Sequence, residues 1–344
     1  MQTDATQLLY RPKGGRRSLR PQDGRQSNLS LILQSLFDEP QLTRADLARS
    51  TGLTRVTISD LVAKLIDESL VEETGWTAGI RPGKPAATLA VRADTYDIVA
   101  LDMSAPDKVL GGVFSLYGEQ RTALSIDLAG RTGQAAIDAL LDMVGQCVSA
   151  ATHPILGIGV GTPGTVDAVG SVISAPNLAW HEVPLQDMIF ERFDLPVAVQ
   201  NDANAAAVAE RSFTDCPSSF IRVQVTKGVG AGILLSGSLI LGGSAAAGEI
   251  GHVVIERDGV TCSCGKQGCL ETWISVPALR GRVEADSGSQ DEILAEAGRR
   301  LGMALAPVVA ALDLHDIVLG GPADLLGGPF LQASQELIID RTHS

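Results

Sequence analysis

The chain has 344 residues, of which 45% are hydrophobic and five are cysteines. This length accommodates one large domain plus a small one, or three lobes of ordinary size, around a sizeable buried core. The sequence shows neither a charged leader before an apolar stretch nor an apolar run of bilayer length. We therefore expect a cytoplasmic protein that is neither secreted nor inserted in a membrane.

Charge is divided unevenly along the chain. The formal net charge of −13 argues against a protein that coats nucleic acid over its whole surface. Residues 1–92 carry 13 Lys and Arg against 10 Asp and Glu, a net of +3, whereas the remainder carries 14 against 30. Phosphate groups would therefore be favoured only at the front of the chain.

The first 26 residues are rich in basic side chains and poor in apolar periodicity. They include Arg11, Lys13, Arg16, Arg17, Arg20 and Arg25. This composition is typical of a flexible basic arm. Contact with DNA phosphates and a merely solvated tail both remain open for the segment, because only some basic arms touch DNA.

Two short helices are predicted after the arm. Residues 28–38 show helical apolar periodicity and end before Pro40, which cannot continue a helix. Thr43 is a suitable N-cap for a second helix over residues 44–50, and Gly52 suits the tight turn that follows.

A third helix is predicted over residues 55–69, with Thr54 as its N-cap. Its predicted apolar stripe is Val56, Ile58, Leu61, Val62, Leu65 and Ile66. Residues 43–65 then have the outline of a helix-turn-helix. Thr54 and the outer-face side chains Arg55, Thr57, Ser59, Asp60 and Lys64 are left for DNA. Such polar and basic groups suit base edges and phosphates in a major groove.

A wing is predicted next: a strand over residues 70–74, a basic turn over 79–85 with Arg81 and Lys84 at its tip, and a returning strand over 87–91. Three small helices can also be a purely structural unit. The wing, the basic arm and the charge asymmetry favour DNA binding over that alternative. We therefore predict a winged helix-turn-helix domain over residues 27–92.

The remainder, residues 93–344, is predicted to be α/β. Short apolar runs at residues 98–101 and 155–160 are typical of buried strands, and residues 134–148 form a helical stretch between them. Glycine-rich turns at residues 157–164, 228–232 and 320–321 suit places where the backbone approaches a ligand. Two similar halves are suggested, although the sequence shows no demonstrable repeat.

The strongest local signal is a group of potential metal ligands. His252 precedes Cys262, Cys264 and Cys269, so three thiols fall within eight residues and glycines stand at the bends. Together they supply a complete tetrahedral set for Zn²⁺ with no open position, which predicts a structural site. A group of reduced thiols or a disulfide is the alternative. Cys147 and Cys216 are predicted to lie in the core.

Carboxylates and amides occur at turn-like positions around this group. Asn201 and Asp202 follow an apolar strand and precede an alanine-rich helix, Glu249 lies three residues before His252, and Glu271 lies two residues after Cys269. Side chains of this kind bind sugar hydroxyls, and Asp202 could also act as a general base. A helix N-cap for Asp202 and plain surface charge for Glu249 and Glu271 remain as alternatives.

At these residues the chain resembles the ROK family of repressors, open reading frames and sugar kinases. The resemblance spans nearly the whole sequence and is carried by the winged helix-turn-helix and by residues 159–164, 175–178, 201–204, 248–252 and 262–271. It implies a two-lobed actin/hexokinase-like (ribonuclease H-like) sugar-kinase fold. It also implies that His252, Cys262, Cys264 and Cys269 hold zinc. By the same resemblance, the sugar pocket contains Gly164, Asn177, Asn201, Asp202, Glu249, His252 and Glu271.

The departures from the family pattern concern ATP. Kinases of the family carry an early Asp-x-Gly-Gly-Thr turn, and the corresponding residues 102–107 here lack both glycines. A second phosphate turn begins with Thr226 and Lys227 in place of Gly-Thr, and Pro322 replaces a glycine of the adenosine-side turn.

The chain also ends soon after Asp340, where the family usually continues with further helix.

We therefore interpret the sequence as a sugar-responsive transcriptional repressor of carbohydrate metabolism, and not as an enzyme. Its expected partners are operator DNA and a sugar or sugar derivative, and its expected assembly is a homodimer or homotetramer. Residues 93–344 would bind the effector and mediate oligomerisation. The alternative is an ATP-dependent sugar kinase of the glucokinase or N-acetylhexosamine kinase type with a fused DNA-binding domain, in which Asp202 is catalytic.

Overall fold

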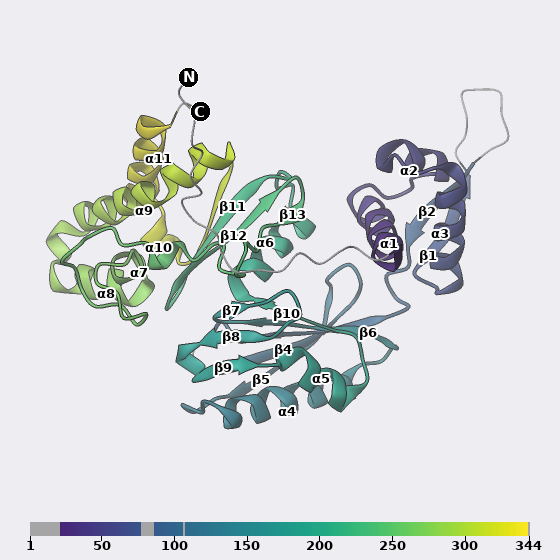
Figure 1. Cartoon of the computed structure of the whole chain (residues 1–344), viewed down its shortest axis with the longest axis horizontal. Helices are drawn as coiled ribbons and strands as arrows, with labels where there is room; N and C mark the ends of the chain where they lie inside the picture. Colours follow the sequence, from purple (N-terminus) through teal and green to yellow (C-terminus); the bar gives the residue numbers. More distant parts are fainter. Residues whose placement is uncertain (1–20, 77–85, 106, 343–344) are drawn as a thin grey trace, which may run out of the picture.

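The computed structural model describes residues 21–76, 86–105 and 107–342. Figure 1 shows a small N-terminal head and two α/β lobes, each built on its own sheet. The head ends with β2 (Ala87–Val91), the first lobe begins with β3 (Asp97–Asp102), and the second begins with α6 (Asp202–Phe213). The predicted fold class is confirmed: a winged helix-turn-helix precedes a two-lobed α/β body.

The head contains three helices and a two-stranded sheet: α1 (Pro21–Asp38), α2 (Arg44–Thr51), α3 (Arg55–Asp67), β1 (Val71–Trp76) and β2. α1 begins at Pro21, so residues 21–26 are helical and the predicted arm extended too far. Proline is favoured in a first helical turn because it lacks the N–H that would have no partner there. Residues 1–20 and the predicted wing tip with Arg81 and Lys84 lie outside the described residues.

The predicted helix starts of α2 and α3 are confirmed. Thr43 and Asp46 form a reciprocal capping box, in which the Asp46 N–H donates to Thr43 Oγ1 (3.2 Å) and the Thr43 N–H donates to Asp46 Oδ2 (2.9 Å). Thr54 caps α3 by accepting from the Thr57 N–H at 3.2 Å. Gly52 closes α2 with φ of 71°, a left-handed conformation that favours glycine.

One residue of α3 contradicts the predicted apolar stripe. Ile58, Leu61, Val62 and Leu65 are buried in the core of the head, whereas Val56 is 72% exposed. The position of Val56 two residues before the buried stripe turns it by about 200° around the helix, away from the core. Residue type alone does not determine which face of a helix a side chain occupies; the helical period does. Leu31, an apolar residue of α1, is likewise exposed, at 39%.

The first lobe has a five-stranded sheet in the order β10-β6-β3-β4-β5. Its remaining strands are β4 (Lys108–Phe114), β5 (Gln120–Asp127), β6 (Ile155–Thr162) and β10 (Val197–Asn201). Helices α4 (Gln134–Ala150) and α5 (Leu185–Phe193) pack against it and share its apolar core. A small antiparallel sheet joins β7 (Thr165–Val166), β8 (Val172–Ala175) and β9 (Trp180–Val183), with a 3-10 turn η1 (Pro176–Leu178).

The second lobe has a four-stranded sheet in the order β13-β12-β11-β14. Its strands are β11 (Phe220–Val225), β12 (Val229–Leu235), β13 (Ser238–Leu239) and β14 (Ile317–Gly320). One core lies between this sheet and its helices, mainly α9 (Gln290–Leu312) with α11 (Pro329–Arg341) behind it. The other elements are η2 (Ile250–His252), α7 (Glu271–Ile274), α8 (Val276–Ala285), η3 (Ser287–Ser289) and α10 (Ala323–Leu326).

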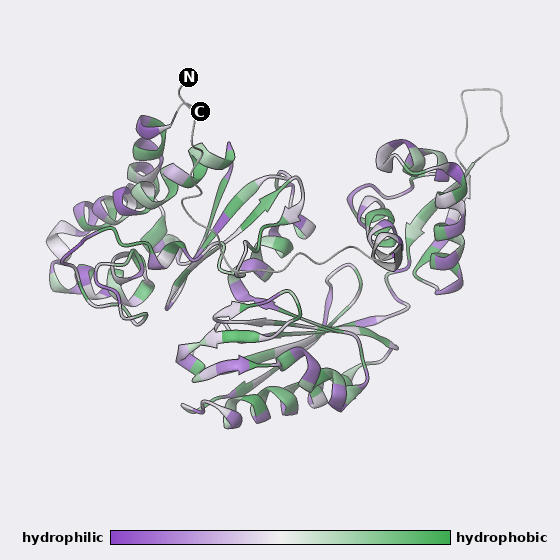
Figure 2. Ribbon diagram, viewed as in Figure 1, coloured by the Kyte–Doolittle hydropathy of each residue, from purple (hydrophilic) through white to green (hydrophobic). Residues whose placement is uncertain are grey.

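The two sheets share a topology that the sequence did not reveal as a repeat. In each lobe the first three strands form an antiparallel meander, and the fourth strand pairs in parallel with the first. In the first lobe β10 then extends the parallel part. Helices α1, α3 and α4 carry both green and purple segments in Figure 2, as expected for helices with one buried face. Within the described residues, every helix is too short or too polar to cross a bilayer.

The head is packed against the first lobe through a shared apolar core. Leu116 of the β4–β5 turn is buried among the core residues of the head. The ring of the adjoining Tyr117 meets Phe37 of α1 edge-on, with ring centroids 5.3 Å apart. Tyr96 donates a hydrogen bond to the Glu68 backbone oxygen at 2.7 Å. The head is thus attached at the amino end of β3 by side chains as well as by the chain itself.

Candidate functional site

Polar side chains meet at the carboxyl ends of three parallel strands in the first lobe. β3 ends at Asp102, β6 at Thr162 and β10 at Asn201; Asp102 pairs with Gly161, and Asn201 pairs with Thr162. Ligands of open α/β sheets bind at this edge because the loops there converge. The head is attached at the opposite end of β3, beside Asp97.

The structure separates the roles of Asn201 and Asp202. Asn201 is the N-cap of α6, since its Oδ1 accepts from the Asn204 N–H at 3.0 Å, and its Nδ2 donates to the Gly164 oxygen at 2.9 Å. Asp202 is the first residue of the helix, so the N-cap alternative for Asp202 is wrong. Burial raises the pKa of Asp202 to about 6, and the nearby charges of Asp102 and Glu249 add to the rise. Perturbed carboxyl groups of this kind are typical of functional sites.

Glu249 and His252 are held beside the start of β12 by two glycines. Gly248 has φ of 90°, and a Cβ there would lie 1.8 Å from the Ala231 oxygen. A Cβ at Gly251 would lie 2.1 Å from the Val229 oxygen. Only glycine therefore allows this segment to lie directly on the strand. His252 Nε2 lies 3.8 Å from Glu249 Oε2, and burial raises the pKa of Glu249.

Glu271 is the first residue of α7 and is turned toward the same region. Its Oε2 accepts from the Val229 N–H at 3.0 Å, and its Oε1 accepts from Ser263 Oγ at 3.4 Å. Its charge also contributes to the raised pKa of Glu249. Glu249 and Glu271 are therefore neighbours with specific environments, which disfavours the alternative of plain surface charge.

Gly164 and Asn177 lie at the first-lobe side of the same site. Gly164 has φ of 91°, and a Cβ there would lie 2.2 Å from the Ser174 oxygen, so the turn tolerates no side chain. The same Cβ would lie 2.7 Å from Ala175 Cβ, two residues before Asn177. Asn177 is exposed on η1. Among the predicted sugar residues, the Asn201–Gly164 hydrogen bond joins β10 to the turn after β6, and the charge of Glu249 acts on Asp202 at the start of α6.

The four predicted metal ligands are also together. Ligand atoms of His252, Cys262, Cys264 and Cys269 all lie within 4.8 Å of one another. His252 Nδ1 lies 3.6 Å from Cys262 Sγ, and Cys264 Sγ lies 3.6 Å from Cys269 Sγ. Ligands placed about 2.1–2.3 Å from a tetrahedral Zn²⁺ are separated by about 3.4–3.8 Å, which agrees with these spacings. The residues present therefore fit a zinc ion.

The electrostatics of the thiols also suit a cation. Burial and the neighbouring thiols Cys264 and Cys262 raise the pKa of Cys269 to about 12. A thiolate at this position therefore requires a compensating positive charge, such as a bound metal ion. Because Nδ1 of His252 faces the thiols, its Nε2 is left toward Glu249. Of the two other cysteines, Cys147 is buried as predicted, whereas Cys216 is only half-buried.

The glycines of the second predicted phosphate turn have a packing role. A Cβ at Gly230 would lie 3.3 Å from Ala203 Cβ, and a Cβ at Gly232 would lie 2.5 Å from Ala207 Cβ, both on α6. These glycines allow α6 to lie close against β12. Their retention is thus explained without a nucleotide. The turn after β3 is closed by Asp102, whose Oδ1 accepts from the Ser104 N–H at 2.7 Å.

The predicted DNA-contacting residues of α3 differ in exposure. Thr54, Arg55 and Ser59 are exposed, whereas Thr57 and Lys64 are half-buried. Lys64 Nζ lies 3.4 Å from Glu68 Oε1. Within residues 39–76 and 86–92 of the described chain, Arg55 is the only Arg or Lys that forms no ion pair. A free cation therefore stands at the amino end of α3.

Two buried polar residues were missed from the sequence. Asp97 is fully buried; burial opposes its ionisation, but the N–H groups of His153 and Thr152 and the Arg121 guanidinium outweigh it and lower its pKa. Asn204 is 2% exposed and donates to Gln200 Oε1 at 3.3 Å, beside the Asn201 cap. A lone polar residue at the edge of an apolar run carries no sequence signal that distinguishes such roles from surface positions.

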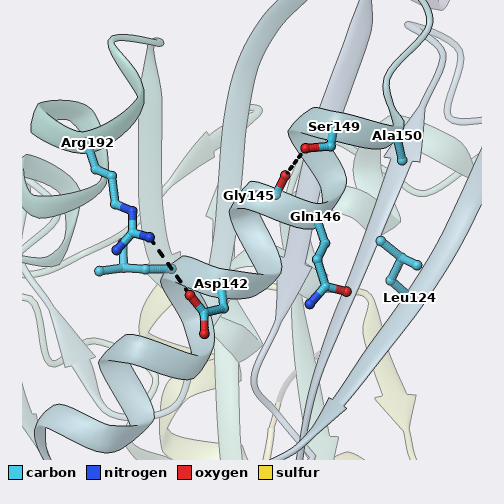
Figure 3. A pocket seen from close by; sticks show the side chains of 8 residues that line it. Leu124, Asp142, Gly145, Gln146, Ser149, Ala150 and Arg192 are labelled. Carbon is cyan, nitrogen blue, oxygen red and sulfur yellow. Dashed lines mark hydrogen bonds and ion pairs between the residues drawn. The ribbon is translucent and has the colours of Figure 1, made fainter.

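A separate pocket lies on the outside of the first lobe, between β5, α4 and α5 (Figure 3). Arg192 of α5 and Asp142 of α4 face each other across it, with Arg192 Nη2 3.8 Å from Asp142 Oδ1. It is lined by Leu124, Leu141, Asp142, Gly145, Gln146, Ser149, Ala150 and Arg192. None of the predicted sugar or metal residues, and none of the predicted DNA residues of α3, belongs to it.

Comparison with known proteins agrees with the arrangement of head and lobes. The xylose repressor of Caldicellulosiruptor bescii is 28% identical over 361 residues, covering 92% of this chain and 88% of that protein. The crystal structure of a ROK family transcriptional regulator, a homolog of E. coli MLC protein, matches in fold with a TM-score of 0.79 at 24% identity, over 92% of this chain and 89% of its own.

The lobes alone match sugar kinases. A ROK family glucokinase from Streptomyces griseus, solved with glucose and AMPPNP, gives a TM-score of 0.62 at 26% identity, over 71% of this chain and 90% of its own. The profile of the ROK family itself matches residues 106–324, well over half of the chain. With that match and with the head, the glycine-bounded carboxylates and the cysteine cluster in position, the chain belongs to the ROK family.

Proposed function

We propose that this protein is a sugar-responsive transcriptional repressor that binds operator DNA through its head and a sugar between its lobes. The observation that carries the proposal is that a single strand, β3, joins the DNA-binding head to the carboxylate site. β3 begins beside the head at Asp97 and ends in the carboxylate site at Asp102. The similarity to a xylose repressor along 92% of the chain supports the same function.

On the DNA side, α3 is the recognition helix. Its amino end carries Thr54, Arg55 and Ser59 exposed, and the unpaired Arg55 is free to contact a base or a phosphate. Thr57 and Lys64 flank this surface. Two heads of a homodimer, or of a homotetramer, would enter successive major grooves of a pseudo-palindromic operator.

On the sugar side, hydroxyl groups would bind to Asn177, Asn201, Asp202, Glu249, His252 and Glu271, against the Gly164 turn. Asp202 and Glu249 accept hydrogen bonds when ionised, and Nε2 of His252 can donate one. Zinc held by His252, Cys262, Cys264 and Cys269 would be structural, because four protein ligands leave no open position. It would fix the orientation of His252 and the loop that leads to Glu271.

Helix α6 provides the route from the sugar to the head. It begins at Asp202 and has 12 residues, which corresponds to a length of about 18 Å. Near its other end, Arg211 Nη2 lies 3.1 Å from Asp38 Oδ2 at the end of α1. Phe213 lies against Gly118, where a Cβ would be 2.7 Å from its ring, and Gly118 follows Tyr117, which packs on α1. A sugar that moved the start of α6 would therefore displace the head.

The change in DNA binding follows from different sugar affinities of two conformations. A sugar shifts the equilibrium between them only by the free energy by which it prefers one. The two lobes meet around the sugar, so closure over it would change the angle between them. That angle would set the spacing of the two heads of a dimer, and with it the fit to an operator.

A sugar kinase is the second candidate, and the raised pKa of Asp202 is the observation that favours it. A carboxylate with a pKa of about 6 suits a general base on a sugar hydroxyl. The loss of both glycines from the turn after β3 and the packing role of Gly230 and Gly232 weaken this candidate. The two functions differ in one product, because only the kinase releases ADP when sugar and ATP are present.

One experiment distinguishes the candidates. Duplexes are selected from a randomised DNA pool by the full-length, zinc-loaded protein, with and without each member of a panel of pentoses, hexoses and N-acetylhexosamines. ADP release is followed with the same sugars. The repressor is supported if a pseudo-palindromic duplex is selected, if one sugar weakens or strengthens its binding to the protein, and if no ADP is released with that sugar. Failure to enrich any duplex, or sugar-dependent ADP release, would overturn it.

A further inference from the structure

Val56 is the most exposed of the large hydrophobic side chains in the described residues, at 72%. It is the second residue of α3, next to the unpaired Arg55. A single exposed apolar residue is ordinary on a protein surface and has no meaning by itself. The position of Val56 on the recognition helix is what distinguishes it.

Two stripes of α3 face opposite directions. Ile58, Leu61, Val62 and Leu65 have the spacing i, i+3, i+4, i+7 and are buried in the head. The same spacing two residues earlier gives Val56, Ser59, Asp60 and Ala63, and all four are exposed. An offset of two residues is about 200° around a helix, so the second stripe points away from the core. Val56 begins this outward stripe and lies at its amino end.

Nothing in the described part of the head, residues 21–76 and 86–92, requires a valine at this position. The buried stripe completes the core without it, and valine has a lower helix propensity than alanine, arginine or glutamate. The amino-terminal residues of a recognition helix lie deepest in the major groove. The free Arg55 cation beside Val56 favours nucleic acid over an apolar protein partner.

We propose that Val56 contacts the C5-methyl group of thymine in each half-site of the operator. This methyl group is the one apolar feature that base pairs present in the major groove, and apolar side chains contact it. Cytosine lacks it, so the contact discriminates T·A from C·G at the position that faces Val56. Asp60, one turn further along the same stripe, accepts hydrogen bonds only and suits a cytosine amino group. The inference rests on the proposed function.

The test uses the full-length protein and the duplex selected in the experiment above. Each thymine of one half-site is replaced in turn by uracil, which pairs identically and lacks only the methyl group. At one of these positions, uracil should lower the affinity of the wild-type protein by about four-fold. This is the effect expected when one methyl group no longer makes an apolar contact. Val56→Ala should bind the thymine and uracil duplexes equally. Its melting temperature should be no lower than that of the wild type, because the side chain is exposed and alanine has the higher helix propensity.

Ala63→Ser is the matched control, since Ala63 lies on the same stripe two turns further from the amino end. It should keep the discrimination between thymine and uracil that Val56→Ala loses. A second check uses an operator variant in which that thymine is replaced by cytosine. Replacing this cytosine by 5-methylcytosine should restore the affinity lost with the methyl group for the wild-type protein and not for Val56→Ala.

Two results would overturn the inference: a wild-type protein insensitive to uracil at every position, or a Val56→Ala variant that discriminates as the wild type does. Either result would leave the repressor function intact, because the duplex would still bind and respond to the sugar. Failure to select any duplex would instead contradict the proposed function.

Discussion

Asp202 is a carboxyl group whose folded environment opposes its charge. Its pKa is about 6 in the folded chain, against an ordinary value of 3.8, so the folded state binds a proton more tightly than the unfolded state. The free energy of unfolding therefore falls as the pH rises from about 4 to about 6, and then stays level. At neutral pH the ionised group destabilises the folded state by an amount on the order of 1–3 kcal/mol. A sugar hydroxyl that donates to Asp202 would recover part of this free energy.

Asp202→Asn should therefore stabilise the sugar-free protein while abolishing sugar binding. Its melting temperature should exceed that of the wild type at pH 8, and the difference should disappear near pH 4, where the wild-type carboxyl group is protonated. Thermal unfolding at several pH values and calorimetric sugar titration test this. A variant less stable than the wild type at pH 8 would mean that Asp202 is a structural group and not a ligand-binding one.

Arg55 is the residue of α3 whose cation is free. Arg55→Ala should weaken binding to the selected operator by about ten-fold, as expected for the loss of one base contact. Arg49→Ala on α2 is the matched control, since Arg49 is also exposed but is paired with Asp46 within its own helix. Equal losses for the two variants in an anisotropy titration would assign the effect to overall charge, and no loss for Arg55→Ala would move the DNA surface away from the start of α3.

At the scale of elements, α6 is the proposed link between the sugar and the head. Arg211→Ala should leave sugar affinity unchanged and reduce the effect of the sugar on DNA affinity several-fold, because it removes the ion pair with Asp38 far from the sugar. Arg192→Ala is the control, since Arg192 forms a similar exposed pair with Asp142 on the outside of the first lobe.

A swapped pair, Asp38→Arg with Arg211→Asp, separates the coupling role from a general loss of stability. The swap should restore the sugar effect that Arg211→Ala reduces, since the ion pair is re-formed with the charges exchanged. Undiminished coupling in Arg211→Ala, measured as the ratio of DNA affinities with and without sugar, would contradict this route.

The cysteine loop is the proposed connection between metal binding and the sugar site. Cys264→Ser should lower the bound zinc below one ion per chain and weaken sugar binding by about ten-fold or more, because Glu271 follows the loop directly. Cys216→Ser, a half-buried cysteine outside the cluster, should change neither quantity. Metal analysis and sugar titration check both variants. If Cys264→Ser kept its full zinc content and the sugar affinity of the wild type, the proposed role of the metal in sugar binding would be wrong.

Sequence patterns predicted the elements of this chain better than the direction of single side chains. Capping residues such as Thr43 and Thr54 act locally, so the starts of α2 and α3 follow from the sequence. Val56 faces outward, contrary to the prediction, because its position in the helical period and not its residue type decides its face. The roles of Gly230 and Gly232 against α6 depend on contacts between distant segments. Asp97 is satisfied by N–H groups more than fifty residues away, which no local pattern indicates.

At the scale of the whole molecule, the carboxylates, the metal ligands and the head form a connected series. The carboxylate site lies at one end of β3 and the head at the other, and α6 spans the same interval. The repeated strand order of the two lobes would place loops from both around a bound sugar. A rigid lobe with a sugar at one end and the DNA-binding head at the other can transmit a change in the angle between the lobes to the DNA. A kinase needs only the closure of its active site. The proposed function therefore depends on coupling between sugar binding and DNA binding.

The most direct measurement is the affinity of the protein for the effector sugar with and without the selected operator duplex, together with the affinity for the duplex with and without the sugar. Linkage requires the two ratios to be equal, and we expect each to lie between about five-fold and a hundred-fold. Asp202→Asn should bind the duplex without any response to the sugar. Ratios of one, with both ligands bound at once and indifferent to each other, would contradict the account.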